Sequence, residues 1–145
     1  LERKIEKGSL YKLDKKLIMT KVDTNYKITN GPAFIDQSNF YHTDSSKKII
    51  YKIKINRGNK IINKRIFKKF KAADGSPDGM TLDRNKNLWV AHFHGARISV
   101  LNPKAKLIHT INLPAKNITN CAFGGPKNNQ LFVTSATKGL NKSDL

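Results

Sequence analysis

Oxygen-bearing side chains recur at one position of a repeated motif in this sequence. Asn30, Asp78 and Asn120 each open a short apolar run, and the steps between them are 48 and 42 residues. Amide and carboxylate oxygens are the ligands that hard divalent cations such as Ca²⁺, Mg²⁺ and Mn²⁺ prefer. Asn-Gly and Asp-Gly are also common turn dipeptides, so a purely structural role is the alternative. Three polar residues in phase with a repeat favour a metal site.

Asp78 can do more than hold a cation. A carboxylate beside a bound cation can orient or deprotonate a water molecule while the cation polarises a carbonyl group. These two actions together suffice to hydrolyse an ester or a lactone. The alternative for Asp78 is a structural turn between Pro77 and Gly79.

Three histidines need separate interpretations. His42 and His92 lie on corresponding predicted strands of successive repeats, so each is a candidate for the wall of a substrate pocket, with simple packing as the alternative. His92 and His94 are two residues apart and could bind metal, but the pair lacks the third ligand of a usual zinc site. Because of their corresponding strand positions, His42 and His92 stay candidates for the wall of a substrate pocket, and the His92–His94 pair is not taken as a metal site.

Cys121 is the only cysteine, so it excludes an internal disulfide and a cysteine-based zinc site. Its apolar neighbours predict a buried, inert thiol. A free thiol fits a reducing compartment, and we expect a cytoplasmic protein. The sequence also lacks a Gly-rich phosphate loop, a nucleophile-elbow serine and a zincin helix.

The formal net charge of +18 raises the question of nucleic acid or an anionic membrane as a partner. Lysines alternate with apolar residues in segments such as 51–55, which is typical of a strand with one solvated face. No stacking aromatic motif and no recognition helix accompanies them. No apolar run approaches the ~20 residues that cross a bilayer. We expect neither nucleic acid nor a membrane as a partner.

The elements that must position these residues are short strands. No segment has a sustained helical period, and short apolar or alternating runs are separated by Gly, Pro, Asn, Asp and Ser, which indicates an all-β fold. The predicted strands are 9–13, 17–20, 31–34, 39–43, 48–55, 64–70, 79–82, 88–92, 97–101, 107–111, 120–123 and 130–134.

The repeat distinguishes a β-propeller from a sandwich or barrel. After Asn30, Asp78 and Asn120 the next strand begins 10, 10 and 11 residues later. A period of ~40–50 residues with about four strands is typical of a propeller blade. The chain then holds about three blades, which are too few to close a ring. We expect residues 1–145 to be a partial propeller domain that is truncated at both ends.

Seven segments, in order and at natural spacing, resemble the SMP-30/gluconolactonase/regucalcin family. Any one of them is a weak signal, whereas seven in register are a strong one. They are GSLYKLD at 8–14, TNGPAF at 29–34, YHTDS at 41–45, SPDGM at 76–80, NLWVA at 87–91, TNCAFGGP at 119–126 and FVTSA at 132–136.

The resemblance implies a six-bladed β-propeller with one divalent cation in its central channel, and the cation could be Ca²⁺, Zn²⁺, Mg²⁺ or Mn²⁺. It implies that Asn30 and Asp78 are metal ligands and that Asp78 is the catalytic acid/base. Asn120 would line the pocket rather than bind the metal. The implied reaction is hydrolysis of a sugar lactone to an aldonic acid.

The sequence departs from the family pattern in what it lacks. The family's glutamate ligand and its Arg and Asn substrate contacts have no counterpart here, so we expect little or no activity from this chain unless the missing half is supplied. A non-catalytic propeller that binds a ligand or a partner is the alternative function, because one fold hosts many activities.

Overall fold

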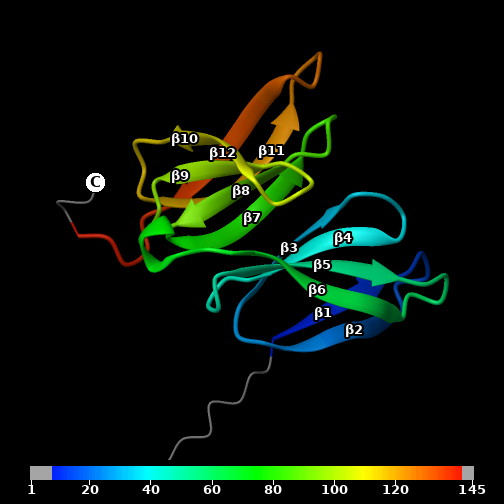
Figure 1. The fold of residues 1–145 in the computed structure, drawn as a ribbon. Coiled ribbons are helices and arrows are strands. Elements are labelled where there is room, and N and C mark those ends of the chain that lie inside the picture. Colours follow the sequence, from blue (N-terminus) through cyan, green and yellow to red (C-terminus); the bar gives the residue numbers. More distant parts are fainter. Residues whose placement is uncertain (1–7, 142–145) are drawn as a thin grey trace, which may run out of the picture.

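The computed structural model describes residues 8–141 and is built almost entirely of strands. The described residues form twelve strands. Figure 1 shows that they follow one another along the chain and form separate, twisted sheets. They are β1 (Gly8–Leu13), β2 (Met19–Tyr26), β3 (Thr29–Phe34), β4 (Asn39–Asp44), β5 (Ile49–Ile55), β6 (Ile61–Lys69), β7 (Ser76–Leu82), β8 (Leu88–Phe93), β9 (Arg97–Leu101), β10 (Leu107–Asn112), β11 (Asn117–Gly124) and β12 (Gln130–Ala136). The all-β prediction is confirmed, and each predicted strand overlaps one of these.

The strands form four antiparallel sheets in sequence order. Two sheets have four strands, β3-β4-β5-β6 and β7-β8-β9-β10, and two have only two, β1-β2 and β11-β12. Each four-stranded sheet is a complete propeller blade, and each two-stranded sheet is a half-blade. The twelve strands therefore amount to three blades, which confirms a partial propeller.

Polar turns set the ends of the strands. Between β3 and β4, the Asp36 carboxylate accepts hydrogen bonds from the backbone N–H groups of Ser38 and Asn39, both at 2.8 Å. Between β7 and β8, the Asp83 carboxylate accepts from the backbone N–H and the side-chain amide of Asn87. Asp side chains that bond to the backbone just ahead stabilise tight turns, so the same chemistry reverses the chain in both blades.

The main core lies between the two complete blades. It includes Tyr41 and Ile50 from the first blade and Met80, Val90 and Leu101 from the second, all buried. Burial of such side chains stabilises each by roughly 1.5–3 kcal/mol. Blade-to-blade packing therefore holds β3 against β7.

The largest difference from the predicted strands is at β2. The sequence predicts a strand over 17–20, whereas β2 runs from Met19 to Tyr26. Leu17 has a φ of 62° and belongs to the preceding turn. The residues that follow Thr20 in β2 are mostly polar, so the pattern of apolar residues did not predict this part of the strand. The predictions also omitted a short 3₁₀ turn, Ala72–Asp74, which leads into β7.

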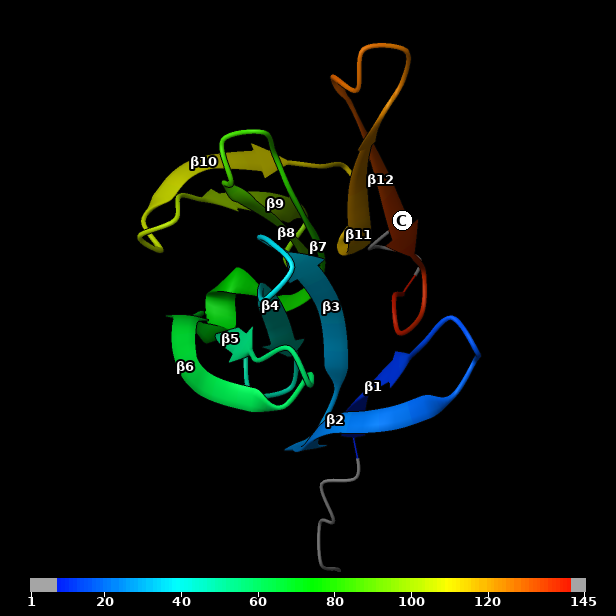
Figure 2. The same cartoon turned by 90° about the vertical axis from the view of Figure 1, so that its right-hand side faces the viewer.

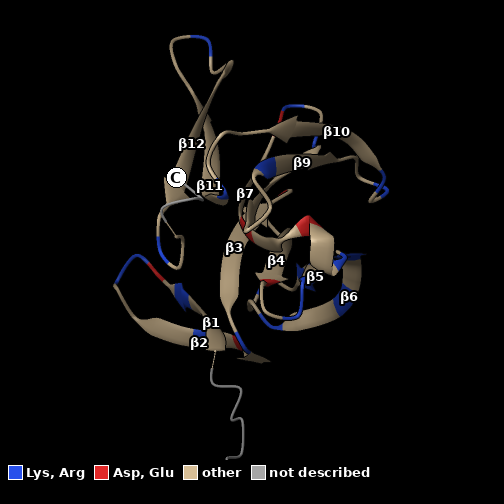
Figure 3. Cartoon of the chain, turned by 90° about the vertical axis from the view of Figure 1, so that its left-hand side faces the viewer, with Lys and Arg blue, Asp and Glu red and all other residues tan. Residues whose placement is uncertain are grey.

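Figure 3 shows lysine and arginine spread over turns and strands in several parts of the fold rather than gathered on one element. In the described residues, no helix is long and apolar enough to cross a membrane.

Candidate functional site

Each of the three inner strands carries a β-bulge close to the polar residue of the repeat. Figure 2 shows β3, β7 and β11 near the middle of the arc of sheets, each at the inner edge of its sheet. The pairing is irregular between Asn30 and Ala33 in β3, between Pro77 and Met80 in β7, and between Ile118 and Asn120 in β11. An extra residue in one strand re-aims side chains, and bulges are common beside active sites. The polar residues of the repeat thus lie at or beside the bulges.

Close backbone approach brings these bulges together. A Cβ atom added at Gly79 would lie 2.2 Å from Asn120 Oδ1 and 2.7 Å from the carbonyl oxygen of Thr119. At Gly31, where φ is 88°, it would lie 2.7 Å from Met80 Cε. Only glycine permits this proximity without movement of a neighbour.

The bulges surround an open pocket of about 340 Å³. Its lining includes residues of β3 (Asn30 to Pro32), β7 (Gly79 and Met80) and β11 (Thr119 and Asn120). The structure therefore brings Asn30 and Asn120, from different repeats, to one pocket.

Asn30 is held in a defined orientation. Its Nδ2 donates a hydrogen bond of 2.8 Å to Ser45 Oγ, and Ser45 is buried. An amide group that donates through nitrogen presents its oxygen on the other side. Asn30 Oδ1 has no hydrogen-bond donor among residues 8–141 in the described structure, so it can serve as a ligand oxygen.

Asp78 is half-buried in the bulge of β7. Burial raises the pKa of its carboxyl group, and a hydrogen bond from the Gly79 backbone N–H opposes that rise. The ion pairs of the described residues, Lys47–Asp44, Lys64–Asp23 and Arg97–Asp74, do not include it. A partly desolvated carboxylate without a cationic partner is suited to bind a cation or to accept a proton.

These donors fit a hard divalent cation better than a zinc site built from nitrogen and sulfur. One amide oxygen and one carboxylate are oxygen ligands of the kind that Ca²⁺, Mg²⁺ and Mn²⁺ accept. No group of three or more His, Cys, Asp or Glu side chains with metal-binding geometry occurs between residues 8 and 141. Further ligands would have to be water, substrate or groups outside this set.

His42 and His92 are not among the residues that line this pocket. They are 1% and 0% exposed, and each ring packs edge-on against an aromatic ring, Tyr26 for His42 and Phe70 for His92, with ring centroids 4.7 Å apart in both pairs. Neither ring has a hydrogen-bond partner in the described structure. Burial is the main cause that lowers the pKa of each to about 4. The structure thus gives both histidines core positions and provides no contact with the pocket predicted for them.

Cys121 is buried, as its apolar neighbours predicted. Its thiol donates a 3.6 Å hydrogen bond to the carbonyl oxygen of Trp89, and burial raises its pKa to about 11. A thiol with such a pKa is a poor nucleophile at neutral pH.

Sequence reasoning missed several residues that shape the site. Ser45 orients Asn30, and Lys48 donates from Nζ to Ser76 Oγ at 2.9 Å and to the Gly75 carbonyl at 3.2 Å, at the start of β7. Ser45 ends the YHTDS segment, so its place in the motif was visible, whereas the contact of Lys48 joins residues from two blades and leaves no local signal.

The family model described as the SMP-30/Gluconolactonase/LRE-like region matches residues 1–137 of this chain. The chain belongs to this family. The match covers both complete blades and both half-blades, so the bulged inner strands lie within the SMP-30/gluconolactonase/LRE-like region.

Curated relatives within this family are similar along nearly the whole chain. An uncharacterized protein of Sulfolobus acidocaldarius is 36% identical over 140 residues, which cover 94% of this chain and 50% of that protein. YvrE of Bacillus subtilis, which carries the provisional name sugar lactone lactonase, is 32% identical over 99% of this chain and 50% of its own length. Regucalcin of Gallus gallus is 34% identical over 100% of this chain and 49% of its own. The chain therefore spans about half the length of the curated relatives it matches.

Solved structures of the family share the fold. A luciferin-regenerating enzyme superposes with a TM-score of 0.87 at 34% identity and covers 97% of this chain and 48% of its own. A calcium-binding protein, regucalcin, from Agrobacterium tumefaciens has the same TM-score at 24% identity, over 95% of this chain and 48% of its own. At 24% identity, the similarity to the regucalcin from Agrobacterium tumefaciens shows a shared fold only.

Proposed function

We propose that this chain carries the central part of a metal-dependent lactonase site, which hydrolyses a sugar lactone to an aldonic acid. The observation that carries the proposal is the pair of oxygen donors, Asn30 and Asp78, at matching bulges of two adjacent inner strands. The provisional name of YvrE, sugar lactone lactonase, points to the same chemistry in a relative.

The cation would be held by Asn30 Oδ1 and by the carboxylate of Asp78. When bound, it would supply a Lewis acid that polarises the lactone carbonyl. Ser45 keeps the Asn30 oxygen oriented by holding its amide nitrogen. Partial burial keeps water from solvating the Asp78 carboxylate fully, which raises its basicity.

Asp78 would act as the general base and then as the general acid. It accepts a proton from a water molecule as the water oxygen bonds to the lactone carbonyl carbon. The ring C–O bond then breaks, and the departing alkoxide takes the proton from Asp78. The product is an open hydroxy acid, and the carboxylate is regenerated.

The polar rim fits such a substrate. Asn120 and Thr119 border the same pocket as Asn30, and their amide and hydroxyl groups can hydrogen-bond to the hydroxyls of a polyol. Asn120 already accepts a hydrogen bond from the Cys121 backbone N–H through its side-chain oxygen, so its amide N–H₂ group is the part that would donate to a substrate.

The test is hydrolysis of a panel of aldonolactones by the full-length gene product that contains this sequence, with and without a chelator. Titration of the chain with Ca²⁺, Mg²⁺, Mn²⁺ and Zn²⁺ by calorimetry measures metal binding separately. Turnover that the chelator abolishes supports the proposal. A folded protein that binds metal but hydrolyses no lactone would be a binding propeller instead.

A further inference from the structure

The turn between β4 and β5 contacts both complete blades beside the candidate site. This turn, residues 45–48, joins the second and third strands of the first complete blade. At its first residue, Ser45 Oγ accepts the 2.8 Å hydrogen bond from Asn30 Nδ2. At its last residue, Lys48 Nζ donates a 2.9 Å hydrogen bond to Ser76 Oγ of the second complete blade. One turn therefore holds a candidate ligand of one blade and the start of an inner strand of the other.

Lys48 holds β7 at its first residues. Its Nζ donates to the carbonyl oxygen of Gly75 at 3.2 Å as well as to Ser76, so one ammonium group bonds to two successive residues. Ser76 is the first residue of β7 and lies two positions before Asp78. The Lys48 side chain is half-buried, and hydrogen bonds from a charged donor are stronger than those between neutral groups. The strand that carries Asp78 is thus tied to the first blade close to that carboxylate.

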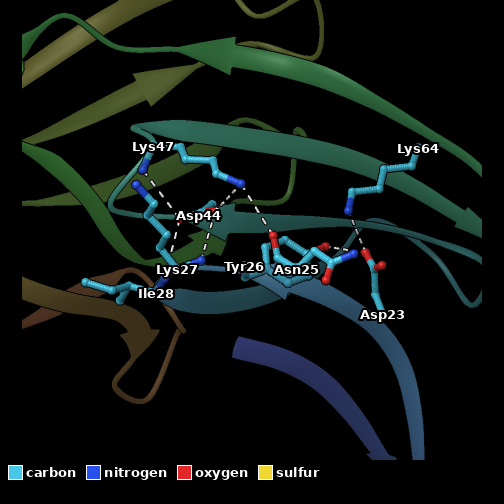
Figure 4. Close-up of polar contacts among 8 residues, drawn as sticks. All are labelled: Asp23, Asn25, Tyr26, Lys27, Ile28, Asp44, Lys47 and Lys64. Carbon is cyan, nitrogen blue, oxygen red and sulfur yellow. Dashed lines mark hydrogen bonds and ion pairs between the residues drawn. The ribbon is translucent and has the colours of Figure 1, made fainter. Parts of the chain in front are cut away.

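A buried carboxylate anchors the turn to the chain that leads into β3. Figure 4 shows Asp44, the last residue of β4, beside Lys27 and Ile28. Asp44 is 0% exposed and accepts hydrogen bonds from the backbone N–H groups of Lys27, at 3.2 Å, and Ile28, at 3.4 Å. Lys47, within the turn, forms a 3.5 Å ion pair with the same carboxylate. A buried charge is stable when it is paired and hydrogen-bonded, so this junction fixes the turn relative to the start of β3.

Backbone hydrogen bonds hold the turn on both sides. The Lys48 N–H donates to the Ser45 carbonyl oxygen at 3.1 Å, and the Lys48 carbonyl oxygen accepts from the Phe70 N–H at 2.9 Å. Lys48 also has a φ of 57°, in the left-handed region that residues with a side chain seldom adopt. Such a conformation persists where the surrounding contacts determine it. The turn is therefore a defined element from which the Lys48 side chain reaches β7.

A second lysine makes a similar bridge between the same blades, but at the outer strands. Lys68 on β6 donates from Nζ to the carbonyl oxygen of Ala105 at 3.4 Å, and Ala105 lies in the turn between β9 and β10. Like Lys48, Lys68 is half-buried and joins an ammonium group of the first blade to a backbone carbonyl of the second. The two bridges differ in what they hold, because Lys68 contacts a turn of the outer strands and Lys48 contacts the inner strand β7.

We infer that Lys48 is a positioning residue for the candidate metal site and that it fixes the separation of Asn30 and Asp78. The inference rests on the proposed function, because it takes Asn30 and Asp78 as ligands of one cation. Lys48 would act through Ser76 and β7 rather than by contact with the cation. Groups that orient metal ligands from outside typically change metal affinity by about 10–100-fold, so an effect of this size is expected from a residue that sets the distance between two ligands.

The test compares Lys48→Met with Lys68→Met in the full-length gene product that contains this sequence. Methionine keeps an unbranched side chain of similar length and removes the donor. Calorimetric titration with Ca²⁺ and with Mn²⁺ should show about tenfold weaker binding for Lys48→Met and wild-type binding for Lys68→Met. At saturating cation, Lys48→Met should lower kcat by about tenfold and change KM by less than about twofold, because misplacement of Asp78 affects the reaction more than it affects substrate binding. Thermal melts in chelator should show a similar loss of stability for both variants.

Two further variants separate positioning from a purely structural role. Lys48→Arg keeps a cationic donor and should recover most of the lost cation affinity. Ser76→Ala removes one of the two acceptors and should weaken cation binding by less than Lys48→Met does. Equal cation affinities of Lys48→Met and Lys68→Met would overturn the inference and leave the proposed function standing, because the wild type would still bind the cation.

A wild-type protein that binds neither Ca²⁺ nor Mn²⁺ would overturn the proposed function, and the positioning role of Lys48 with it. If Lys48→Met does not fold, Ser76→Ala decides in its place. Weaker cation binding by folded Ser76→Ala supports the inference, and wild-type binding overturns it.

Discussion

The two complete blades share one frame but differ in the chemistry that they carry. Each has a bulged inner strand and a buried histidine that packs edge-on against an aromatic ring. At the bulge, however, one blade has Asn30, whose amide is bonded to Ser45, and the other has Asp78, a carboxylate without an ion-pair partner in the described structure.

Positions that are alike in the two blades therefore maintain the fold, whereas the positions at which the blades differ form the candidate site. His42 and His92 are alike because packing requires the same shape twice. Under the proposed function, Asn30 and Asp78 differ because a hydrolytic site needs a neutral ligand and a basic one for different tasks. Substitutions at Asn30 and Asp78, where the blades differ, should thus alter activity more than stability. Substitutions at His42 and His92, where the blades are alike, should alter stability more than activity.

The largest effect is expected for Asp78→Asn. Loss of the general base should lower lactone turnover by about 10²–10⁴-fold. In the metal-free protein the same change should raise the melting temperature, because the folded state raises the pKa of Asp78 and therefore disfavours its ionised form at neutral pH. Turnover and thermal melts in chelator measure both effects.

The matched control is Asp83→Asn in the same blade. Asp83 accepts hydrogen bonds from Asn87 and Trp89 in a turn, so its loss should lower stability and leave turnover per folded molecule unchanged. If Asp78→Asn and Asp83→Asn changed turnover and stability in the same way, the distinction between residues of the site and residues of the fold would be wrong.

The shared histidines should make the fold sensitive to mild acid. Burial lowers the pKa of His42 and of His92 from 6.5 to about 4, so the folded state disfavours their protonation. As pH falls from 6.5 toward 4, the unfolded chain binds protons that the folded chain does not, and stability falls by about 3 kcal/mol for each histidine. Denaturant unfolding at pH 7 and pH 4.5 measures this loss.

His42→Phe and His92→Phe should each remove about half of that acid sensitivity, since the aromatic contacts remain and the titrating group does not. The two variants should behave alike. An unchanged pH profile in either one would show that its histidine is protonated within the fold.

Gly79→Ala tests the contact between the bulges of β7 and β11. The new Cβ would meet Asn120 Oδ1 at 2.2 Å and the Thr119 carbonyl oxygen at 2.7 Å, so the free energy of unfolding should fall by about 1–3 kcal/mol. Gly58→Ala is the control, because its nearest neighbour would be 3.4 Å away. Equal melting temperatures for the two variants would contradict the close approach.

The smallest effect is expected for Ser45→Ala. It removes the 2.8 Å hydrogen bond that orients Asn30, which should cost about 1 kcal/mol of stability. Metal affinity should fall by about tenfold, because groups that orient ligands typically matter to that extent. Calorimetric titration measures the affinity, and Ser45→Thr, which retains a hydroxyl, should restore part of it.

Much of the fold could be predicted from local pattern. Short alternating runs between turn residues predict all twelve strands, because burial of one face imposes a period of two on each strand. Most of β2 was not predicted because Lys21 to Asn25, which are mostly polar, lie on a poorly covered half-blade, where burial imposes no such pattern. The repeat also predicts that Asn30, Asp78 and Asn120 occupy matching places on inner strands.

The rest of the site depends on contacts between blades, which leave no local trace. The residue type and strand position of His42 and His92 suggested that they line a pocket. In the structure, however, the ring of Tyr26 packs on His42 and the ring of Phe70 packs on His92, each from the preceding sheet or the segment that follows it. The bond from Asn30 to Ser45 lies within one blade, but it joins residues 15 positions apart. Whether Asn30 and Asp78 share one cation stays a prediction.

The order of the strands within each sheet has a kinetic consequence. Every sheet is formed by strands that are consecutive in the chain, so each hairpin can close over a short loop before distant segments meet. Folding can then begin in any blade and spread to its neighbour, as in other repeat proteins. The same locality lets one blade open while the others remain folded, and the opening of either complete blade would separate the bulges that line the pocket.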